Sequence, residues 1–223
     1  MPLPIGRLHV LTDVQFQTRL SHAGLAERAI AGGADVIQFR DKHGALRDRL
    51  AALRETVAAC RRADAATCLV DDDLALALAT DAGGVHLGQL DLPIADARRI
   101  LDRQARATRV VGATATTAAQ ARRAEADGAD YIGFGPVFPT ASKANPASVK
   151  GLEGLAEACR AVSIPVVAIA GITPERVAPC LDAGAWGVAV MTAVSTADRP
   201  TAAAQAFREA IDRWLAERGA GSR

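Results

Sequence analysis

The stretch Asp127-Gly128-Ala129-Asp130 closes an Ala- and Arg-rich segment and leads directly into the apolar run Tyr131-Ile132-Gly133-Phe134. Glycine is typical of the residue after a helix, because it adopts a left-handed backbone without a steric penalty. The stretch therefore predicts a helix-to-strand turn. Similar phrases recur at three other places: Gly32-Gly33-Ala34-Asp35, Asp81-Ala82-Gly83-Gly84 and Asp182-Ala183-Gly184-Ala185.

Short β-branched or apolar runs alternate with Ala-, Arg- and Glu-rich stretches along the whole chain. The runs predict eight strands, at Leu8–Leu11, Val36–Phe39, Thr67–Val70, Gly84–Leu87, Arg109–Val111, Tyr131–Phe134, Val166–Ile169 and Gly187–Val190. The stretches between them predict eight helices, at Ala23–Ala31, Leu46–Arg62, Leu74–Ala79, Ile94–Asp102, Thr117–Ala126, Leu152–Ala161, Pro174–Asp182 and Thr201–Ala216. Ser21, Thr117 and Thr173 are suited to cap helix starts, and Pro174 suits a first helical turn.

Eight alternating β/α units favour a closed parallel barrel, because closure covers every strand and leaves no edge. The predicted fold class is therefore α/β, a single-domain (β/α)8 TIM barrel over residues 1–223. A short disordered tail is expected at residues 218–223. An open doubly wound sheet is the alternative, but no G-x-G-x-x-G follows the first predicted strand.

The composition excludes several classes of protein. The 26 basic and 25 acidic residues nearly balance, with no basic stripe that would indicate a nucleic-acid or membrane-surface partner. No apolar run has the length of a membrane span, and no signal peptide is visible, so we expect a cytoplasmic protein. The four scattered cysteines are expected to be small core residues. The sequence leaves open whether copies of the chain form a homo-oligomer.

In such a barrel, functional residues follow the carboxyl ends of the strands. After the second predicted strand come Gln38, Arg40 and Lys42, with Gln38 and Arg40 on one face and directed together into the barrel mouth. Arginine and lysine together are suited to a diphosphate. The alternative is a solvated turn with an Arg–Asp pair.

Acidic residues follow the next two predicted strands. Asp71-Asp72-Asp73 follows the third predicted strand. Asp91 follows the fourth, at the end of the sequence Gly88-Gln89-Leu90-Asp91. Carboxylates from neighbouring loops suit Mg²⁺, which takes one or two of them and completes its shell with water and phosphate oxygens. The alternative for Asp73 is a helix cap. His86, within a strand, is interpreted as a packed core residue.

The long loop Gly133–Lys143 carries the hydroxyls of Thr140 and Ser142 and one of only three lysines, Lys143. These groups are typical of an anion-binding loop. Gly171 after the seventh predicted strand, and Met191-Thr192 after the eighth, lie where barrels of this type bind phosphate. A plain strand-to-helix turn is the alternative at Gly171.

Taken together, these segments resemble the thiamine-phosphate synthase family from Leu8 to the last predicted strand. The motifs that carry the resemblance are Gln38–Lys42, Val70-Asp71-Asp72, Gly84-Val85-His86-Leu87-Gly88-Gln89-Leu90-Asp91-Leu92-Pro93, Gly133–Lys143 and Pro165-Val166-Val167-Ala168-Ile169-Ala170-Gly171-Ile172. The resemblance implies a Mg²⁺-dependent transferase that joins a pyrimidine methyl diphosphate to a thiazole phosphate and releases diphosphate. Its partners are then small phosphorylated substrates.

The resemblance also implies a role for each matching residue. Arg40, Lys42 and Lys143 are the implied catalytic residues, and Asp72 and Asp91 the implied Mg²⁺ ligands. The implied pyrimidine diphosphate site comprises Gln38, Arg40, Lys42, Asp71, Thr114 and Lys143. The implied thiazole phosphate site comprises Thr140, Ser142, Gly171, Met191 and Thr192.

Thr114, Ser142 and Met191-Thr192 depart mildly from the family pattern, and two other positions depart more strongly. Asp71 stands where the family usually has asparagine, and Ala170 replaces the first of two usual glycines. One alternative is the related thiazole tautomerase family, which typically has a histidine where this chain has Thr116. Others are a non-catalytic phosphate-binding regulatory barrel and, more distantly, a sugar-phosphate epimerase.

Overall fold

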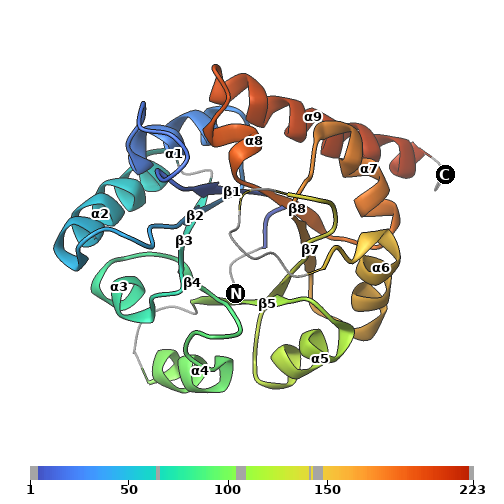
Figure 1. The fold of residues 1–223 in the computed structure, drawn as a ribbon, viewed down its shortest axis with the longest axis horizontal. Helices are drawn as coiled ribbons and strands as arrows, with labels where there is room; N and C mark the ends of the chain where they lie inside the picture. The colour runs from blue at the N-terminus through green and yellow to red at the C-terminus, as the bar shows by residue number, and fades with distance from the viewer. Residues whose placement is uncertain (1–4, 64–65, 104–108, 141, 143–147, 221–223) are drawn as a thin grey trace.

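The computed structural model describes residues 5–63, 66–103, 109–140, 142 and 148–220. Eight parallel strands form a closed barrel in chain order: β1 (Leu8–Thr12), β2 (Val36–Phe39), β3 (Thr67–Asp71), β4 (Gly84–Leu87), β5 (Val110–Ala115), β6 (Tyr131–Phe134), β7 (Val166–Ile169) and β8 (Gly187–Val190). Helices surround the barrel (Figure 1): α1 (His22–Ala31), α2 (Leu46–Ala63), α3 (Leu74–Ala79), α4 (Ile94–Asp102), α5 (Ala118–Ala126), α6 (Gly151–Ala161), α7 (Pro174–Asp182), α8 (Thr192–Ser195) and α9 (Pro200–Ala220).

The predicted (β/α)8 TIM barrel is confirmed, and β2, β4, β6, β7 and β8 have the predicted bounds. The main error is β5, which continues beyond the predicted Arg109–Val111 to Ala115. Its backbone pairs with β4 from Val110 to Ala113 and with β6 from Gly112 to Ala115. The run Gly112–Ala115 has little side-chain preference for a strand. The four-residue α8 was not predicted.

The helix α9 continues through Arg218 to Ala220, where the sequence predicted the start of a disordered tail. The Arg218 guanidinium pairs with the carboxylate of Asp182 on α7 at 2.5 Å and stacks over the ring of Trp214. These contacts hold the last turns of α9 against the neighbouring helix. Among the described helices, none combines the length and apolar character of a membrane span.

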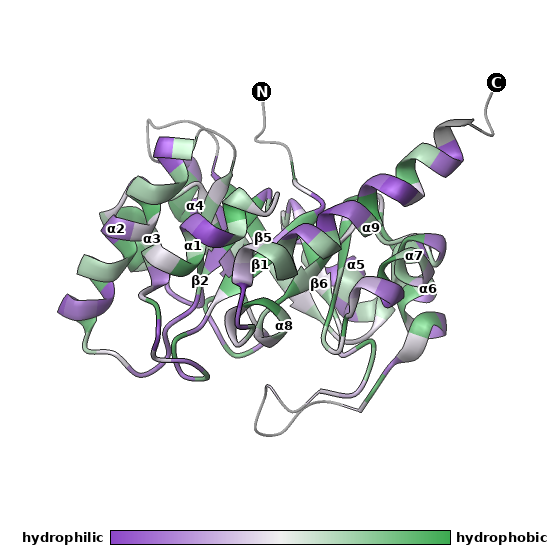
Figure 2. Ribbon diagram, turned by 90° about the horizontal axis from the view of Figure 1, so that it is seen from above, coloured by the Kyte–Doolittle hydropathy of each residue, from purple (hydrophilic) through white to green (hydrophobic). Residues whose placement is uncertain are grey.

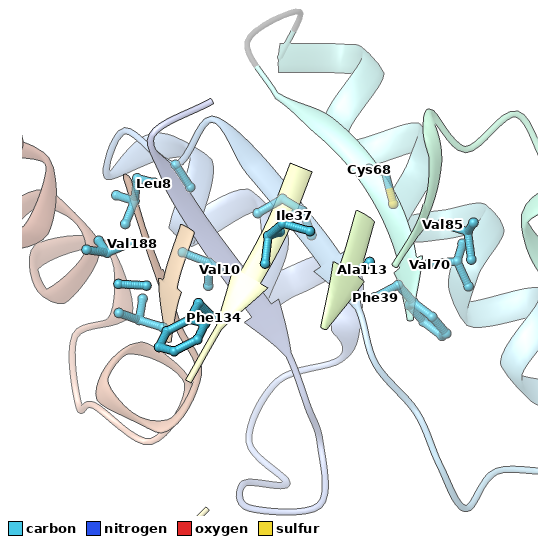
Figure 3. Packing of buried hydrophobic residues seen from close by; sticks show 14 of the residues in the cluster. Leu8, Val10, Ile37, Phe39, Cys68, Val70, Val85, Ala113, Phe134 and Val188 are labelled. Atoms are coloured by element: carbon cyan, nitrogen blue, oxygen red, sulfur yellow. The ribbon is translucent and has the colours of Figure 1, made fainter. Parts of the chain in front are cut away.

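The core has two parts. Strand side chains that point outward pack against the helices in one large cluster, and ten of them are labelled in Figure 3, from Leu8 on β1 to Val188 on β8. A smaller cluster fills the barrel interior: Leu11, Val36, Leu69, Val110, Tyr131, Val167 and Ala189. This division follows from the two-residue period of a strand, in which successive side chains face opposite sides.

Side-chain caps begin several helices as expected. Ser21 accepts a hydrogen bond from the backbone of Gly24, and Thr117 accepts one from that of Gln120. Thr173 occupies the capping position of α7 without such a bond, and Pro174 forms the first turn.

Two glycines make room for large polar side chains inside the barrel. A Cβ atom on Gly112 would lie 2.3 Å from the ring of Tyr131 and 2.5 Å from Nδ1 of His86. A Cβ atom on Gly133 would lie 2.9 Å from Cε1 of His86. A side chain at Gly112 would overlap both rings, and one at Gly133 would overlap the ring of His86, so both positions favour glycine.

We predict that Gly112→Ala lowers the free energy of unfolding by about 1–3 kcal/mol, as expected for overpacking a filled interior. Thermal or urea denaturation measures the change. Gly24→Ala is the matched control, since a Cβ atom there meets nothing closer than 3.4 Å and α1 gains helix propensity. Equal stability of the two variants would contradict the packing described for Gly112.

Candidate functional site

Charged and hydroxyl side chains gather where the strands end. Figure 2 shows the barrel from the side, with largely hydrophilic loops along its lower edge. These loops include the segments after β2, β3 and β4, which carry the predicted cationic and acidic residues. Because all the strands are parallel, their carboxyl ends lie at the same mouth.

Two cations at this mouth are held by carboxylates. The Arg40 guanidinium pairs with Asp13, which follows β1 and is buried. The Lys42 ammonium lies 2.9 Å from Oδ2 of Asp72 across the gap between the β2 and β3 loops. The predicted neighbourhood of Lys42 and Asp72 is thus present, whereas Asp13 was not foreseen. Its only signal in the sequence is its position two residues after a predicted strand.

Asp72 and Asp91 form an acidic pair. Burial raises the pKa of Asp91 above its ordinary value, and the nearby Asp72 raises it further, against the opposing effect of a hydrogen bond from Gly88. That bond, from the Gly88 backbone N–H to Oδ2 of Asp91, is 2.6 Å long. Asp72 has a positive φ of 67° and donates its own N–H to the carbonyl of His86. The Gly88 N–H therefore orients the Asp91 carboxylate, and the bond to His86 fixes the backbone of Asp72.

Asp73 belongs to the helix and not to the acidic pair. Its side chain accepts a hydrogen bond from the Leu76 backbone N–H at 3.0 Å and caps α3. Arg49 on α2 also lies 3.4 Å from the same carboxylate. The capping alternative proposed from the sequence is confirmed.

Asp71, the last residue of β3, is buried, and its Oδ1 atom has no hydrogen-bond partner among the described residues. Burial raises the pKa of Asp71 well above its ordinary value, and the charge of Asp72 adds to the effect. The surroundings therefore favour a neutral carboxyl. In that form it has an O–H donor beside a carbonyl acceptor, and so resembles an asparagine amide in offering both kinds of group.

Gln38 lies deeper than predicted. Its Nε2 atom is 3.1 Å from Nδ1 of His9 and 3.1 Å from the hydroxyl of Tyr131, and the side chain is buried. We predicted that Gln38 and Arg40 point together into the mouth. The amide nitrogen of Gln38 instead points to partners inside the barrel. Buried histidine and tyrosine partners inside the barrel hold that nitrogen.

His86 and Thr114 stand between this buried layer and the mouth. Nε2 of His86 lies 3.0 Å from Oγ1 of Thr114, and Nδ1 lies 2.8 Å from the hydroxyl of Tyr131. Sequence reasoning treated His86 as a core residue and did not single out Tyr131 or His9. Tyr131 is the only tyrosine of the chain, and that was the available signal.

A second group of residues meets across the ends of β6, β7 and β8. Oγ of Ser142 lies 2.9 Å from Oγ1 of Thr192, and the Ser142 backbone donates to Oγ1 of Thr140 at 3.2 Å. Met191 precedes Thr192 at the start of α8. The structure thus brings the predicted hydroxyl residues together. Lys143, predicted beside them, lies outside the described residues.

Gly171 is packed closely against the loop after β6. A Cβ atom there would lie 2.5 Å from the carbonyl oxygen of Pro139, and φ is 65°. Ala170, the preceding residue, also has a positive φ, of 79°. An alanine in this region carries a steric cost that a glycine avoids. The turn after β7 therefore keeps its shape at the expense of backbone strain at Ala170.

Among the described residues there is no group of three or more His, Cys, Asp or Glu side chains that would hold a metal ion alone. The Asp72–Asp91 pair nevertheless matches the donor set of Mg²⁺, which usually takes one or two carboxylates and leaves the other positions to water and phosphate. These two residues are the best candidates to hold such an ion, together with a phosphorylated ligand.

Comparison with known proteins assigns the chain. Residues 8–194 match the family model described as thiamine monophosphate synthase. The chain belongs to this family. A thiamine-phosphate synthase of Salinibacter ruber is 56% identical over 96% of this chain and 92% of its own length, and one of Methanocella arvoryzae is 46% identical over 93% and 95%. The solved thiamine phosphate pyrophosphorylase of Pyrococcus furiosus superposes with a TM-score of 0.84, at 36% identity over 94% of this chain and 96% of that one.

In this member of the thiamine monophosphate synthase family, the positive φ of Ala170 should have a measurable effect on stability. We predict that Ala170→Gly raises the free energy of unfolding by about 0.5 kcal/mol or more, because relief of the left-handed strain exceeds the added chain entropy of glycine. Urea denaturation measures it. Ala183→Gly, at an ordinary φ of −71°, is the control and should lose stability. A loss of similar size in both variants would contradict the prediction.

Proposed function

We propose that this protein is a thiamine-phosphate synthase that joins a pyrimidine methyl diphosphate to a thiazole phosphate, giving thiamine phosphate and diphosphate. The observation that carries the proposal is the 56% identity to a named synthase over 96% of the chain. The arrangement of the barrel mouth supports it. Cationic and acidic residues occupy the loops after β2 to β4, and hydroxyl residues occupy those after β6 and β8.

Two neighbouring sites that each bind an anionic substrate suit a coupling reaction. In the proposed reaction the bond to the diphosphate breaks first, and the thiazole nitrogen then captures a pyrimidine-stabilised cation. Negative charge builds on the departing oxygens, so cations held near them stabilise the transition state more than the ground state. We assign this role to Arg40, Lys42 and Lys143. This dissociative route needs no strong base.

Mg²⁺ is the proposed cofactor, with Asp72 and Asp91 as its protein ligands. When bound, it would supply Lewis-acid stabilisation of the leaving diphosphate. The pairing of Lys42 with Asp72 in the ligand-free protein keeps the acidic pair partly neutralised. Gln38, Asp71 and Thr114 complete the proposed pyrimidine diphosphate site.

The proposed thiazole phosphate site comprises Thr140, Ser142, Gly171, Met191 and Thr192. The hydrogen bonds that join Thr140, Ser142 and Thr192 support it, because hydroxyl and backbone donors at one place suit a phosphate. We further propose that the enzyme works in the cytoplasm. The four cysteines are free, as expected in a reducing compartment.

An isomerase acting on the thiazole phosphate alone is less well supported. The histidine typical of the tautomerase family is replaced by Thr116, whose hydroxyl donates to Oε1 of Gln120 at 3.0 Å. The Thr116 backbone N–H donates to the same oxygen at 2.7 Å. This side chain therefore serves the start of α5.

The purified protein is expected to form thiamine phosphate from both substrates with Mg²⁺, and to stop when a chelator is added. We predict that Asp91→Asn lowers kcat/KM about 100-fold or more, because one proposed ligand loses its charge. Chromatographic assay of thiamine phosphate measures this. Asp96→Asn, in a surface ion pair with Arg99, is the control. Turnover indifferent to Mg²⁺, or isomerisation of the thiazole phosphate without the pyrimidine, would contradict the proposal.

The Lys42–Asp72 pair leads to a separate prediction about the free protein. Both side chains are partly exposed, so the pair stabilises only modestly. Lys42→Met should therefore raise the affinity of the ligand-free protein for Mn²⁺ by up to about 5-fold. With diphosphate present the same variant should bind Mn²⁺ more weakly, since diphosphate loses a cationic partner.

Electron paramagnetic resonance of free Mn²⁺ measures both affinities. Lys150→Met, whose ammonium bonds only to Ser148 among the described contacts, is the control and should change neither value. An unchanged or lower Mn²⁺ affinity of ligand-free Lys42→Met would show that Lys42 does not compete for Asp72.

A further inference from the structure

A continuous chain of polar side chains crosses the barrel interior beneath the proposed diphosphate site. It begins at the carbonyl of Gly6 and ends at Thr114 on β5. Its members are joined by contacts of 2.8–3.1 Å and lie in the order His9, Gln38, Tyr131, His86 and Thr114. The two ends differ, because a backbone carbonyl only accepts and a hydroxyl does both.

The position of each proton follows from the carbonyl end. Nε2 of His9 lies 3.1 Å from the carbonyl oxygen of Gly6 and must donate to it. Burial lowers the pKa of His9 to about 3, so the ring is neutral and its Nδ1 is an acceptor. The group that faces Nδ1 must then be the NH₂ of Gln38. The second hydrogen of this NH₂ is directed to the hydroxyl oxygen of Tyr131, at 3.1 Å.

The hydroxyl of Tyr131 donates the next hydrogen bond, to His86. Its oxygen accepts from Gln38, so its own hydrogen needs an acceptor, and Nδ1 of His86 lies 2.8 Å away. Without that bond a buried hydroxyl hydrogen would be unsatisfied, which is costly. The remaining hydrogen of His86 is then on Nε2 and is donated to Oγ1 of Thr114, at 3.0 Å.

The outcome at Thr114 does not depend on the charge of His86. A neutral ring with its proton on Nε2 donates to Thr114, and a doubly protonated ring does so as well. In both cases one lone pair of the Thr114 oxygen is occupied. Its hydroxyl hydrogen is left over and is directed away from His86.

The barrel is built around this arrangement. Gly112 and Gly133 are the positions where a Cβ atom would overlap Tyr131 or His86, and the rings of His9 and His86 each pack 5.3 Å from that of Tyr131. The rings therefore have little freedom to turn over, and the hydrogen-bond direction is held by packing.

We propose that Tyr131 and His86 are positioning residues that fix the Thr114 hydroxyl as a hydrogen-bond donor toward the departing diphosphate. The inference rests on the proposed synthase function. It adds that Thr114 always presents its hydrogen, and never a lone pair, to an anion at the mouth. A donor that is already oriented toward the developing negative charge stabilises the transition state without a free-energy cost for reorienting it during the reaction.

The first experiment uses the ligand-free protein. Nitrogen-15 NMR of imidazole-labelled histidine distinguishes the protonated from the unprotonated ring nitrogen of His9, His22, His43 and His86, and His86→Gln assigns the signal of interest. We expect the proton of neutral His86 on Nε2, with Nδ1 hydrogen-bonded. In Tyr131→Phe the Nδ1 signal should move to that of an unbonded acceptor. A proton on Nδ1 in the parent protein would overturn the proposal.

The second experiment is a double-mutant cycle on kcat. Thr114→Val should lower kcat about 10- to 100-fold with little change in KM, as expected for loss of a hydrogen bond to a charged group. Tyr131→Phe should lower kcat less, about 5- to 20-fold. The double variant should equal Thr114→Val, because Tyr131 acts through Thr114. Thr116→Val, the same change two residues later, is the control with unchanged kcat.

The outcomes separate the inference from the function on which it rests. Additive losses in the cycle, with equal thermal stability of the single variants, would show that Tyr131 does not act through Thr114. A parent protein that makes no thiamine phosphate would instead refute the proposed function, and the NMR result would still report the proton positions. Thr114→Ser, which keeps the hydroxyl, should retain most of kcat.

Discussion

The hydroxyl of Tyr131 imposes the constraint around which the barrel interior is arranged. It is buried among hydrophobic side chains from the other strands, so it must accept and donate hydrogen bonds within the protein. Gln38 and His86 meet these two needs. An eight-stranded barrel has little interior space, so some strand positions next to Tyr131 must lack a side chain. Gly112 is one of them.

The charged mouth above this interior is balanced in the ligand-free protein. Arg40 is neutralised by Asp13 and Lys42 by Asp72, while burial favours a neutral Asp71. In its neutral form Asp71 would not add negative charge at the position where the family usually has asparagine. A diphosphate entering such a site meets cations whose present partners are carboxylates. In the proposed reaction its binding would be an exchange of partners, in which Mg²⁺ would take the place of the Lys42 ammonium at Asp72.

Much of the fold could be predicted from the sequence, because the alternation of apolar runs and helical stretches repeats eight times and only a closed barrel leaves no edge. The prediction failed at β5, where glycine and alanine carry no strand preference and pairing with both neighbours decides the structure. The sequence also predicted that Asp72 lies near Asp91, and that the hydroxyl residues Thr140, Ser142 and Thr192 lie together. The depth of Gln38 and the partnership of Arg40 with Asp13 were not, since both depend on contacts between residues far apart in the chain.

The extra length of β5 connects the fold to the chemistry. Thr114 lies within this strand and pairs with Gly133 on β6, so its backbone is rigid, whereas Lys42 lies on an exposed loop. The two kinds of group suit different tasks. Cations on loops can follow a ligand as it enters and leaves, while a donor on a strand keeps its direction throughout. Charge that develops during bond breaking is best met by dipoles already in place, because turning them at that moment costs free energy. The polar chain inside the barrel therefore lies beneath a strand residue and not beneath a loop.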